Sequence, residues 1–393
     1  MNYDKESLAL HKKHQGKIRI APKMDVHSTH DLSLVYSPGV AAPCLEIAAD
    51  EEKVWDYTIK GNCVAIVTDG SAVLGLGNIG AKASIPVMEG KAMLFKRFAG
   101  IDAFPIALDT QDTEKIIETV KLISPIFGGV NLEDISAPRC LEIEERLQDI
   151  GIPVFHDDQH GTAIVVLGGL INACKVAGKK LEDIKVVING AGAAGIAIAK
   201  LLRCVDNANE TACIPVKEIL VCDSKGVISR DRDDLNDAKK KLLTFTNPTN
   251  ISGDLKDAIK DADVFIGVSV GDILKAEDIA TMADKSIVFA LANPQPEIMP
   301  EEAYKGGALI VGTGRSDLPN QVNNVLGFPG IFRGALDAKA KRITPKMKLA
   351  AAYAIADCIK YPNAMEVIPA TLNMSVATAV AEAVKKAALE EGA

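Results

Sequence analysis

Aromatic residues are scarce in this sequence. They make up 4% of its 393 residues, and only one of them is a tryptophan. Alanine, valine, isoleucine and leucine must therefore fill the core, as they do in parallel sheets that are buried on both faces. Hydrophobic residues make up 48% and charged residues 24%, which is typical of a soluble globular protein. The chain length favours two domains.

The sequence also has no excess of positive charge. Its formal net charge is −8, whereas a nucleic-acid partner needs a basic surface to neutralise phosphates. Two short basic clusters, Lys179-Lys180 and residues 239–241, are expected to be solvated helix or loop faces. We therefore expect no nucleic-acid partner.

Long apolar runs and cysteine pairs are missing as well. The first 17 residues are polar, so no signal peptide is predicted. The most apolar stretch, residues 161–178, is interrupted by Asn172 and Lys175, which favours a buried helix over a membrane span. The eight cysteines include no C-x-x-C pair. We therefore expect reduced thiols, a cytoplasmic location and no membrane association.

Short apolar runs alternate with amphipathic segments, which is typical of βαβ units and parallel sheets. The helices expected most clearly span 112–123, 139–150 and 375–390. The expected strands span 63–68, 103–108, 126–130, 152–155, 185–189, 218–222, 263–268, 286–291 and 308–311. The fold class predicted is α/β with two domains. An N-terminal α/β substrate and catalytic domain spans 1–160, and a C-terminal Rossmann-type doubly wound parallel sheet with packing helices spans 161–393.

Two glycine motifs of the form G-x-G-x-x-G compete for the role of dinucleotide loop. The second comprises Gly190, Gly192 and Gly195, with Ala193 and Ala194 between the last two. A strand runs directly into it and a helix of small residues follows, which is the order that a dinucleotide fold requires. The first motif, residues 75–80, is separated from its strand and is expected to be a turn that permits close packing.

The strand after the second motif ends in Asp223, the acid expected to contact the ribose hydroxyls of the cofactor. The segment 204–217 resembles an insertion that delays this acid. A carboxylate accepts a hydrogen bond from a 2′-hydroxyl and repels a 2′-phosphate, so we expect NAD. Lys225 lies nearby and leaves NADP as the alternative.

Carboxylates follow two of the expected strands, at the edge where α/β sheets build their sites. Glu133 and Asp134 follow one strand, and Asp157 and Asp158 follow the next. Three carboxylates from two loops would form the oxygen-rich site preferred by Mg²⁺ or Mn²⁺. The stretch HDDQH, residues 156–160, taken alone also allows a zinc helix. Read with the other acidic pair it favours a hard cation, with the two histidines outside the ligand set.

The chain resembles the malic enzyme family, in the short prokaryotic branch. The resemblance covers nearly the whole sequence and rests on many motifs in one order. These motifs are VYSPGVAAP (35–43), VTDGSAVLGLGNIG (67–80), PVMEGKAMLFKRFAG (86–100), NLEDI (131–135), VFHDDQHGTA (154–163), NGAGAAG (189–195), FALANPQPE (289–297) and GRSDLPNQVNNVLGFPG (314–330).

The resemblance implies oxidative decarboxylation of L-malate to pyruvate and CO₂, with reduction of NAD(P) and a divalent metal. Oxaloacetate decarboxylation is implied as a partial reaction. The metal ligands would be Glu133, Asp134 and Asp158. The resemblance further implies a homodimer and leaves open whether the partner chain completes the active site. Longer family members carry an arginine for a malate carboxylate where this chain has Ala72, so another group must hold that carboxylate here.

The same resemblance assigns the remaining catalytic and substrate residues. Lys91 would be the base and Tyr36 the acid. Asn293 and either Asn323 or Asn324 would bind substrate, with Asn293 also near the cofactor. To accept the hydroxyl proton Lys91 must be neutral, so burial or a nearby cation is expected to lower its pKa. Asp157 is expected to orient Lys91 or a metal ligand through a hydrogen bond.

Two other functions are compatible with parts of the sequence. A 2-hydroxy-acid or amino-acid dehydrogenase that releases its keto acid intact would share the two-domain organisation, but hydride transfer alone needs no carboxylate-bound metal. A non-catalytic dinucleotide sensor would need the Gly190 loop without the lysine, tyrosine and acids. Release of CO₂ from malate distinguishes the proposed enzyme from both.

Overall fold

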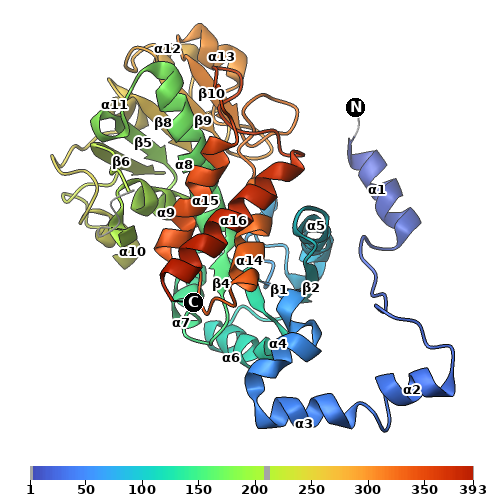
Figure 1. The fold of residues 1–393 in the computed structure, drawn as a ribbon. Coiled ribbons are helices and arrows are strands. Elements are labelled where there is room, and N and C mark those ends of the chain that lie inside the picture. The colour runs from blue at the N-terminus through green and yellow to red at the C-terminus, as the bar shows by residue number, and fades with distance from the viewer. Residues whose placement is uncertain (1–2, 208–212, 393) are drawn as a thin grey trace.

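A computed structural model describes residues 3–207 and 213–392, and Figure 1 shows them as two lobes joined by a long central helix. The N-terminal lobe contains a four-stranded parallel sheet in the order β2-β1-β3-β4. Valine, isoleucine and alanine dominate the central strand β1, and all of its residues are buried. The strands are β1 (Cys63–Thr68), β2 (Asp102–Ala107), β3 (Gly129–Leu132) and β4 (Val154–His156).

The second lobe contains a six-stranded sheet in the order β10-β9-β8-β5-β6-β7. All pairs are parallel except β6 with the two-residue strand β7. The strand order reverses between β5 and β8, the point where doubly wound sheets bind their ligand. The predicted α/β class is thus confirmed. The strands are β5 (Lys185–Asn189), β6 (Glu218–Asp223), β7 (Gly226–Val227), β8 (Val264–Gly267), β9 (Ile287–Ala290) and β10 (Ile310–Thr313).

The central helix α8 (Asp157–Ala177) begins directly after β4 and connects the two sheets. It is the one helix of the described residues that is long and apolar enough to cross a membrane, but 78% of its apolar window is buried inside the protein. The buried amide of Asn172 donates hydrogen bonds to the carbonyl oxygens of Ala356 and Val367. It is therefore a core helix, as predicted from the sequence.

The other helices cover the two sheets or extend from them. Phe328 and Phe332 of α14 pack on Phe95 of α5, with ring centroids 4.7 and 5.4 Å apart, so the C-terminal segment returns to the N-terminal lobe. The helices of the N-terminal part are α1 (Tyr3–His14), α2 (Thr29–Val35), α3 (Ala41–Ala49), α4 (Val54–Tyr57), α5 (Ala81–Ala99), α6 (Thr113–Ile123) and α7 (Arg139–Arg146). Those of the C-terminal part are α9 (Ala193–Leu202), α10 (Asp237–Leu242), α11 (Leu255–Ile259), α12 (Ala276–Ile279), α13 (Pro300–Lys305), α14 (Phe328–Asp337), α15 (Pro345–Asp357) and α16 (Met374–Glu390).

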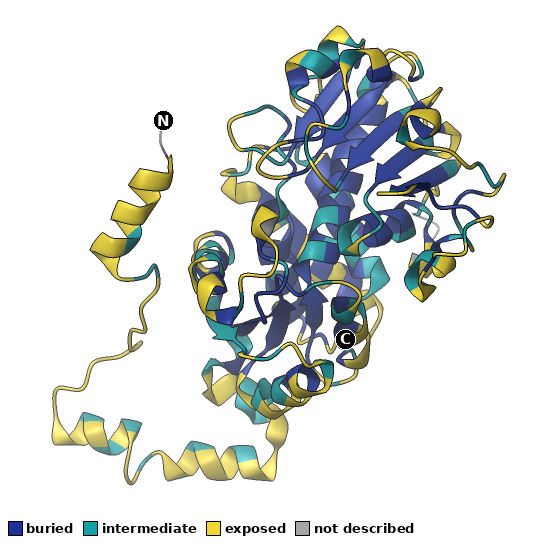
Figure 2. Cartoon of the chain, turned by 180° about the vertical axis from the view of Figure 1, so that it is seen from behind, coloured by how far each residue is buried: buried dark blue, intermediate teal, exposed yellow. Residues whose placement is uncertain are grey.

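The first three helices form an arm that extends away from both lobes (Figure 1). None of them contains a buried residue, and Figure 2 shows the arm almost entirely as exposed surface. Large apolar side chains along it are exposed to solvent, among them Leu8 (73%), Ile20 (84%) and Leu45 (71%). Exposed apolar surface of this extent is typical of a segment that contacts another molecule.

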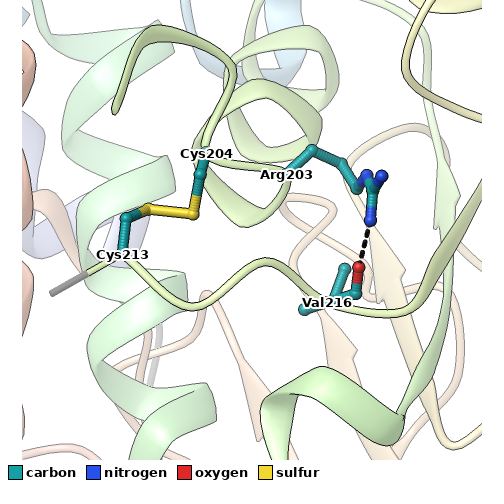
Figure 3. Close-up of a disulfide and its surroundings, with 4 residues drawn as sticks. All are labelled: Arg203, Cys204, Cys213 and Val216. Carbon is teal, nitrogen blue, oxygen red and sulfur yellow. Dashed lines mark hydrogen bonds between the residues drawn. A yellow bond between two sulfur atoms is a disulfide. The ribbon is translucent and has the colours of Figure 1, made fainter. Parts of the chain in front are cut away.

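The expectation that all the cysteines are reduced thiols was wrong. Cys204 and Cys213 form a disulfide, with their Cα atoms 5.9 Å apart, at the two ends of the loop that follows α9 (Figure 3). Beside it, the Arg203 side chain donates a hydrogen bond to the carbonyl oxygen of Val216. The chain turns back after α9 and brings the two cysteines together, which their spacing in the sequence does not reveal. The other six cysteines are free.

Candidate active site

Three carboxylates meet at the carboxyl edge of the N-terminal sheet. Glu133 and Asp134 follow β3, and Asp158 lies in the first turn of α8, so the adjacent strands β3 and β4 bring them together. One oxygen from each lies within 4.8 Å of the other two. Asp134 has a left-handed backbone (φ 53°), and its N–H donates to Asp158 Oδ2 at 2.8 Å. This backbone contact fixes the two loops relative to each other.

The carboxylate cluster fits a divalent cation. Oxygens that share a cation at about 2.1 Å lie about 3.0 Å apart when adjacent and about 4.2 Å apart when opposite, so the cluster needs only a small contraction. The neighbouring histidines lie outside this oxygen group, although His156 Nε2 is 3.7 Å from Asp158 Oδ2. The His156 ring accepts a hydrogen bond from the N–H of Gln159, and His160 Nε2 lies 2.8 Å from Glu144 Oε1. The donor set is therefore all oxygen, as Mg²⁺ or Mn²⁺ prefers.

Lys91 projects from α5 into the same cluster. It is 8% exposed, its Nζ contacts Asp157 Oδ2, and it lies 2.8 Å from Glu133 Oε1. The Phe328 ring centroid is 4.1 Å from Nζ. Burial by itself disfavours the charged lysine, but the two carboxylates outweigh it, and the pKa of Lys91 is raised. The expected lowering of this pKa was therefore wrong for the protein alone, because the sequence suggested Asp157 as a partner but did not show that Glu133 is a second one.

Of the three predicted asparagines, one contacts these groups. Asn324 Nδ2 donates to Asp157 Oδ2 at 3.1 Å and to the Asp157 carbonyl oxygen at 3.2 Å. Asn323 instead accepts from the N–H of Val325 and caps a short 3₁₀ turn. Asn293 forms a cis peptide with Pro294, and its carbonyl oxygen would be 2.4 Å from a Cβ placed at Gly75. The 293–294 loop therefore packs on the loop after β1.

The second glycine motif has the geometry of a dinucleotide loop. Gly190 follows β5 with φ +126°, a conformation that favours glycine. A Cβ at Gly195 would lie 1.8 Å from the Gly190 carbonyl oxygen, whereas a Cβ at Gly192 would meet nothing within 4 Å. Ala193 and Ala194 begin α9, and Gly192 is its N-cap residue, so the free N–H groups of the first helical turn lie at this loop. The 75–80 motif is a turn that permits close packing at Gly75, as expected.

Asp223 ends β6 as predicted, but its carboxylate is already engaged. Arg232 binds both oxygens at 2.8 and 3.0 Å, and Lys239 Nζ lies 2.6 Å from Oδ2. Burial by itself would raise the pKa of Asp223, but these two cations lower it to about 2. Lys225 pairs with Asp234 instead, at 2.9 Å. Arg232 was not predicted as a partner of Asp223, and Lys239 was expected to be solvated, because both lie beyond β7 in the chain and meet Asp223 only through tertiary packing.

Tyr36 is the one predicted catalytic residue that stands apart. It follows α2 on the extended arm and is 69% exposed. Within the described part of the chain, its hydroxyl makes no hydrogen bond with Lys91 or with the acidic cluster. The structure therefore brings together Lys91, Asp157, the three carboxylates and Asn324, but not Tyr36.

A glycine motif with the geometry of a dinucleotide loop, a buried lysine and a cluster of three carboxylates together fit a dinucleotide-dependent oxidoreductase of two-lobed α/β build. Comparison with known proteins narrows this class. Residues 15–118 match the malic enzyme N-terminal domain, and residues 159–389 match the malic enzyme NAD-binding domain. The chain belongs to the malic enzyme family.

Individual relatives agree with this assignment. A bifunctional malic/malolactic enzyme of Bacillus subtilis is 59% identical over 100% of this chain and 94% of its own length. An NAD-dependent malic enzyme of Geobacillus stearothermophilus is 56% identical, over 96% and 77% respectively. The crystal structure of malic enzyme from Pyrococcus horikoshii superposes with a TM-score of 0.94 at 50% identity, covering 99% of this chain and 91% of that one. The resemblance inferred from the motifs is confirmed.

Proposed function

We propose that this protein oxidises L-malate with NAD(P) and releases CO₂ and pyruvate, with a divalent cation bound by Glu133, Asp134 and Asp158. The contact of Lys91 with Asp157 and Glu133 carries the proposal. In this contact a buried lysine lies beside the cluster of three carboxylates, which supports proton transfer next to a bound cation. The names of the relatives support the same reaction.

When bound, the cation would polarise the hydroxyl-bearing carbon of malate and withdraw electrons as the β-carboxylate leaves. The chain's own residues do the rest. Next to a bound cation Lys91 would release its own proton to solvent and, as the neutral amine, would accept the malate hydroxyl proton. Asp157 holds Lys91 Nζ, and the Asn324 amide holds Asp157 by donating to its side chain and its carbonyl oxygen. Asn293 and Asn324 offer neutral N–H donors for a malate carboxylate. Oxaloacetate decarboxylation is the corresponding partial reaction.

Tyr36 would donate the proton that the enol product needs at C3, but its own chain keeps it away from Lys91. We assign it to the active site of a partner subunit. The arm that carries Tyr36 exposes apolar residues along α1 to α3, which a second copy of the chain would cover. The proposed assembly is therefore a homodimer in which each arm completes the other subunit's site.

For the cofactor, we propose NAD, with NADP as an accepted alternative. Asp223 is the ribose acid, which suits NAD. Its charge is offset by Arg232 and Lys239, which could contact a 2′-phosphate, so Asp223 is a weaker barrier to NADP than its sequence position suggests. The cytoplasmic location expected from the sequence stays a prediction.

A single assay tests the reaction. Purified protein is mixed with malate, Mn²⁺ and either NAD or NADP, and both reduced dinucleotide and CO₂ are measured. We expect both products in equal amounts. Reduced dinucleotide without CO₂ would identify a non-decarboxylating dehydrogenase, and binding of dinucleotide without turnover would identify a sensor.

A further inference from the structure

A cavity lies between the two lobes and is separate from the residues of the proposed active site. It is a cavity of about 820 Å³, bounded by α7, the first turns of α8, one face of α9, α10 and the start of α15. Its lining includes neither Lys91 nor the three carboxylates, nor the glycines of the dinucleotide loop. A volume of this size holds a small organic molecule.

Five lysine and arginine side chains line this cavity, and one of them, Arg139, is paired with Asp69. The other four are Lys200, Lys241, Arg342 and Lys348. Within residues 3–207 and 213–392, none of the four has a carboxylate within 4 Å or a side-chain hydrogen bond. Three of the five acidic residues that line the cavity already have basic or histidine partners. Glu142 pairs with Arg146, Asp237 with Lys240 and Glu144 with His160. Only Glu145 and Asp206 remain to offset four cations, so the cavity is locally positive in a chain of net charge −8.

Lys348 shows that this positive charge lacks compensation. Burial lowers the pKa of Lys348, and Lys200 lowers it further, although Glu144 and Asp206 act in the opposite direction. A bound anion would offset the cost of burying the charged Lys348 side chain beside Lys200. The opposite part of the wall is apolar, with Ile164, Leu242, Phe245 and Ile343 among its residues. The cavity thus offers cations at one place and an apolar surface at another.

We propose that this cavity binds an organic phosphate, with the phosphate on Lys200, Arg342 and Lys348 and the organic body against Phe245 and its apolar neighbours. Lysine and arginine together recognise phosphate oxygens by charge-assisted hydrogen bonds. The basic residues come from separate elements, α9, the segment before α15 and α15 itself, so one anion would join them.

The position of the cavity connects it to both halves of the proposed active site. Glu144 lines the cavity and holds the first turn of α8 through Gln159 (3.1 Å) and His160 (2.8 Å), and that turn carries Asp157 and Asp158. Lys200 lies on α9, which begins at the dinucleotide loop. A ligand here is therefore placed to change dinucleotide affinity, and dinucleotide must then change its affinity by the same factor.

Calorimetric titration tests the anion site, with inorganic pyrophosphate as the probe. The full chain is kept free of divalent metal and saturated with NAD, so that the cofactor's own phosphate site is filled. We expect saturable binding that weakens about tenfold or more in Lys200→Gln/Lys348→Gln. The matched control, Lys115→Gln/Lys121→Gln on exposed α6, removes the same charge outside the cavity and should bind as the parent does. Circular dichroism and retained NAD binding establish that each variant is folded.

Three results would overturn the proposal: no saturable binding, equal weakening in both double variants, or displacement of NAD by pyrophosphate. Phenyl phosphate tests the apolar wall. It should bind more tightly than inorganic phosphate, and Phe245→Ala should remove that advantage while leaving pyrophosphate binding unchanged. Equal affinity for the two phosphates would reject an organic ligand. These titrations measure no turnover, so their failure is distinct from failure of the proposed reaction.

Discussion

Lys91 Nζ lies 2.8 Å from Glu133 Oε1. The residue expected to move a proton is thus ion-paired with a residue expected to hold the cation. The pair is buried on both sides, with each side chain 9% exposed. Removing either partner leaves the other charge buried without compensation, which destabilises a protein more than loss of a surface pair does. Tests of this site therefore need a folding measurement beside each activity measurement.

Replacing Lys91 by alanine should abolish malate oxidation while NAD binding persists. General acid–base groups contribute about 10²- to 10⁴-fold to rate, and we expect a loss in kcat of that size. Turnover is followed by reduced dinucleotide, and NAD binding by calorimetry. Lys96→Ala, on the exposed face of the same helix, serves as the control and should retain activity. Normal kcat in the Lys91 variant would remove the lysine from the mechanism.

Asp158→Ala should weaken Mn²⁺ binding. Removing a residue that hydrogen-bonds a metal ligand typically weakens metal affinity by about 10- to 100-fold. We expect the loss of a direct ligand to weaken Mn²⁺ affinity by more than this. Metal-dependent activity and direct Mn²⁺ titration both report the change. Asp149→Ala removes an exposed carboxylate nearby in the sequence and should leave the Mn²⁺ affinity unaltered. If the two variants bind Mn²⁺ equally well, the three-carboxylate site is wrong.

Gly192→Val should fold and yet fail to bind the dinucleotide. A Cβ at this position meets nothing within 4 Å, and the backbone φ of −91° suits any residue. The side chain would instead occupy the space in which the pyrophosphate approaches the loop. The measurements are a thermal melt, expected to match the parent, and fluorescence titration with NADH. Unchanged NADH affinity would exclude this loop as the cofactor site.

Mixing two inactive subunits tests whether the arm completes a partner's site. Tyr36→Phe and Lys91→Ala chains are each expected to be inactive in malate turnover. If Tyr36 acts across the dimer, a mixed dimer contains one intact site, and an equal mixture should recover about a quarter of the parent activity. If Tyr36 acts within its own chain, every site in the mixture carries a defect. No recovery after verified subunit exchange would reject the shared site.

The ion pairs of Asp223 predict a pH-dependent contribution to stability. Its pKa is lowered to about 2 from an ordinary value near 3.8, so the stabilisation is complete above about pH 4 and is lost as the pH falls toward 2. Its size is about 2 kcal/mol. Asp223→Asn should therefore lower the unfolding free energy at pH 7 by about that amount, with a smaller difference at pH 3. Asp284→Asn, an exposed control, should show neither effect, and a constant difference for Asp223→Asn across this range would contradict the ion-pair assignment.

Strand positions show how far local pattern predicts the fold. The run at 126–130 was expected to be a strand, but β3 spans Gly129–Leu132, because Ser124–Ile126 forms a 3₁₀ turn. The expected helix at 139–150 ends at Arg146. Both segments were placed in the correct region of the chain, but the strand was wrong at both ends and the helix at its C-terminal end. Turn geometry decides such ends, and apolar periodicity contains little information about it.

Local sequence pattern was sufficient to predict the α/β class, the glycine turn between β5 and α9 and the acidic residues that follow adjacent strands. These features depend on neighbours in the chain: the period of apolar residues, the place of glycines and the residues that follow a strand. Only the tertiary structure decided that Lys91 is held by Asp157 and Glu133, that Asp223 is neutralised by Arg232 and Lys239, and that Cys204 bonds Cys213. It also placed Tyr36 on an arm outside its own site. Each of these depends on which distant segments pack together, and charge and burial at a side chain follow from that packing.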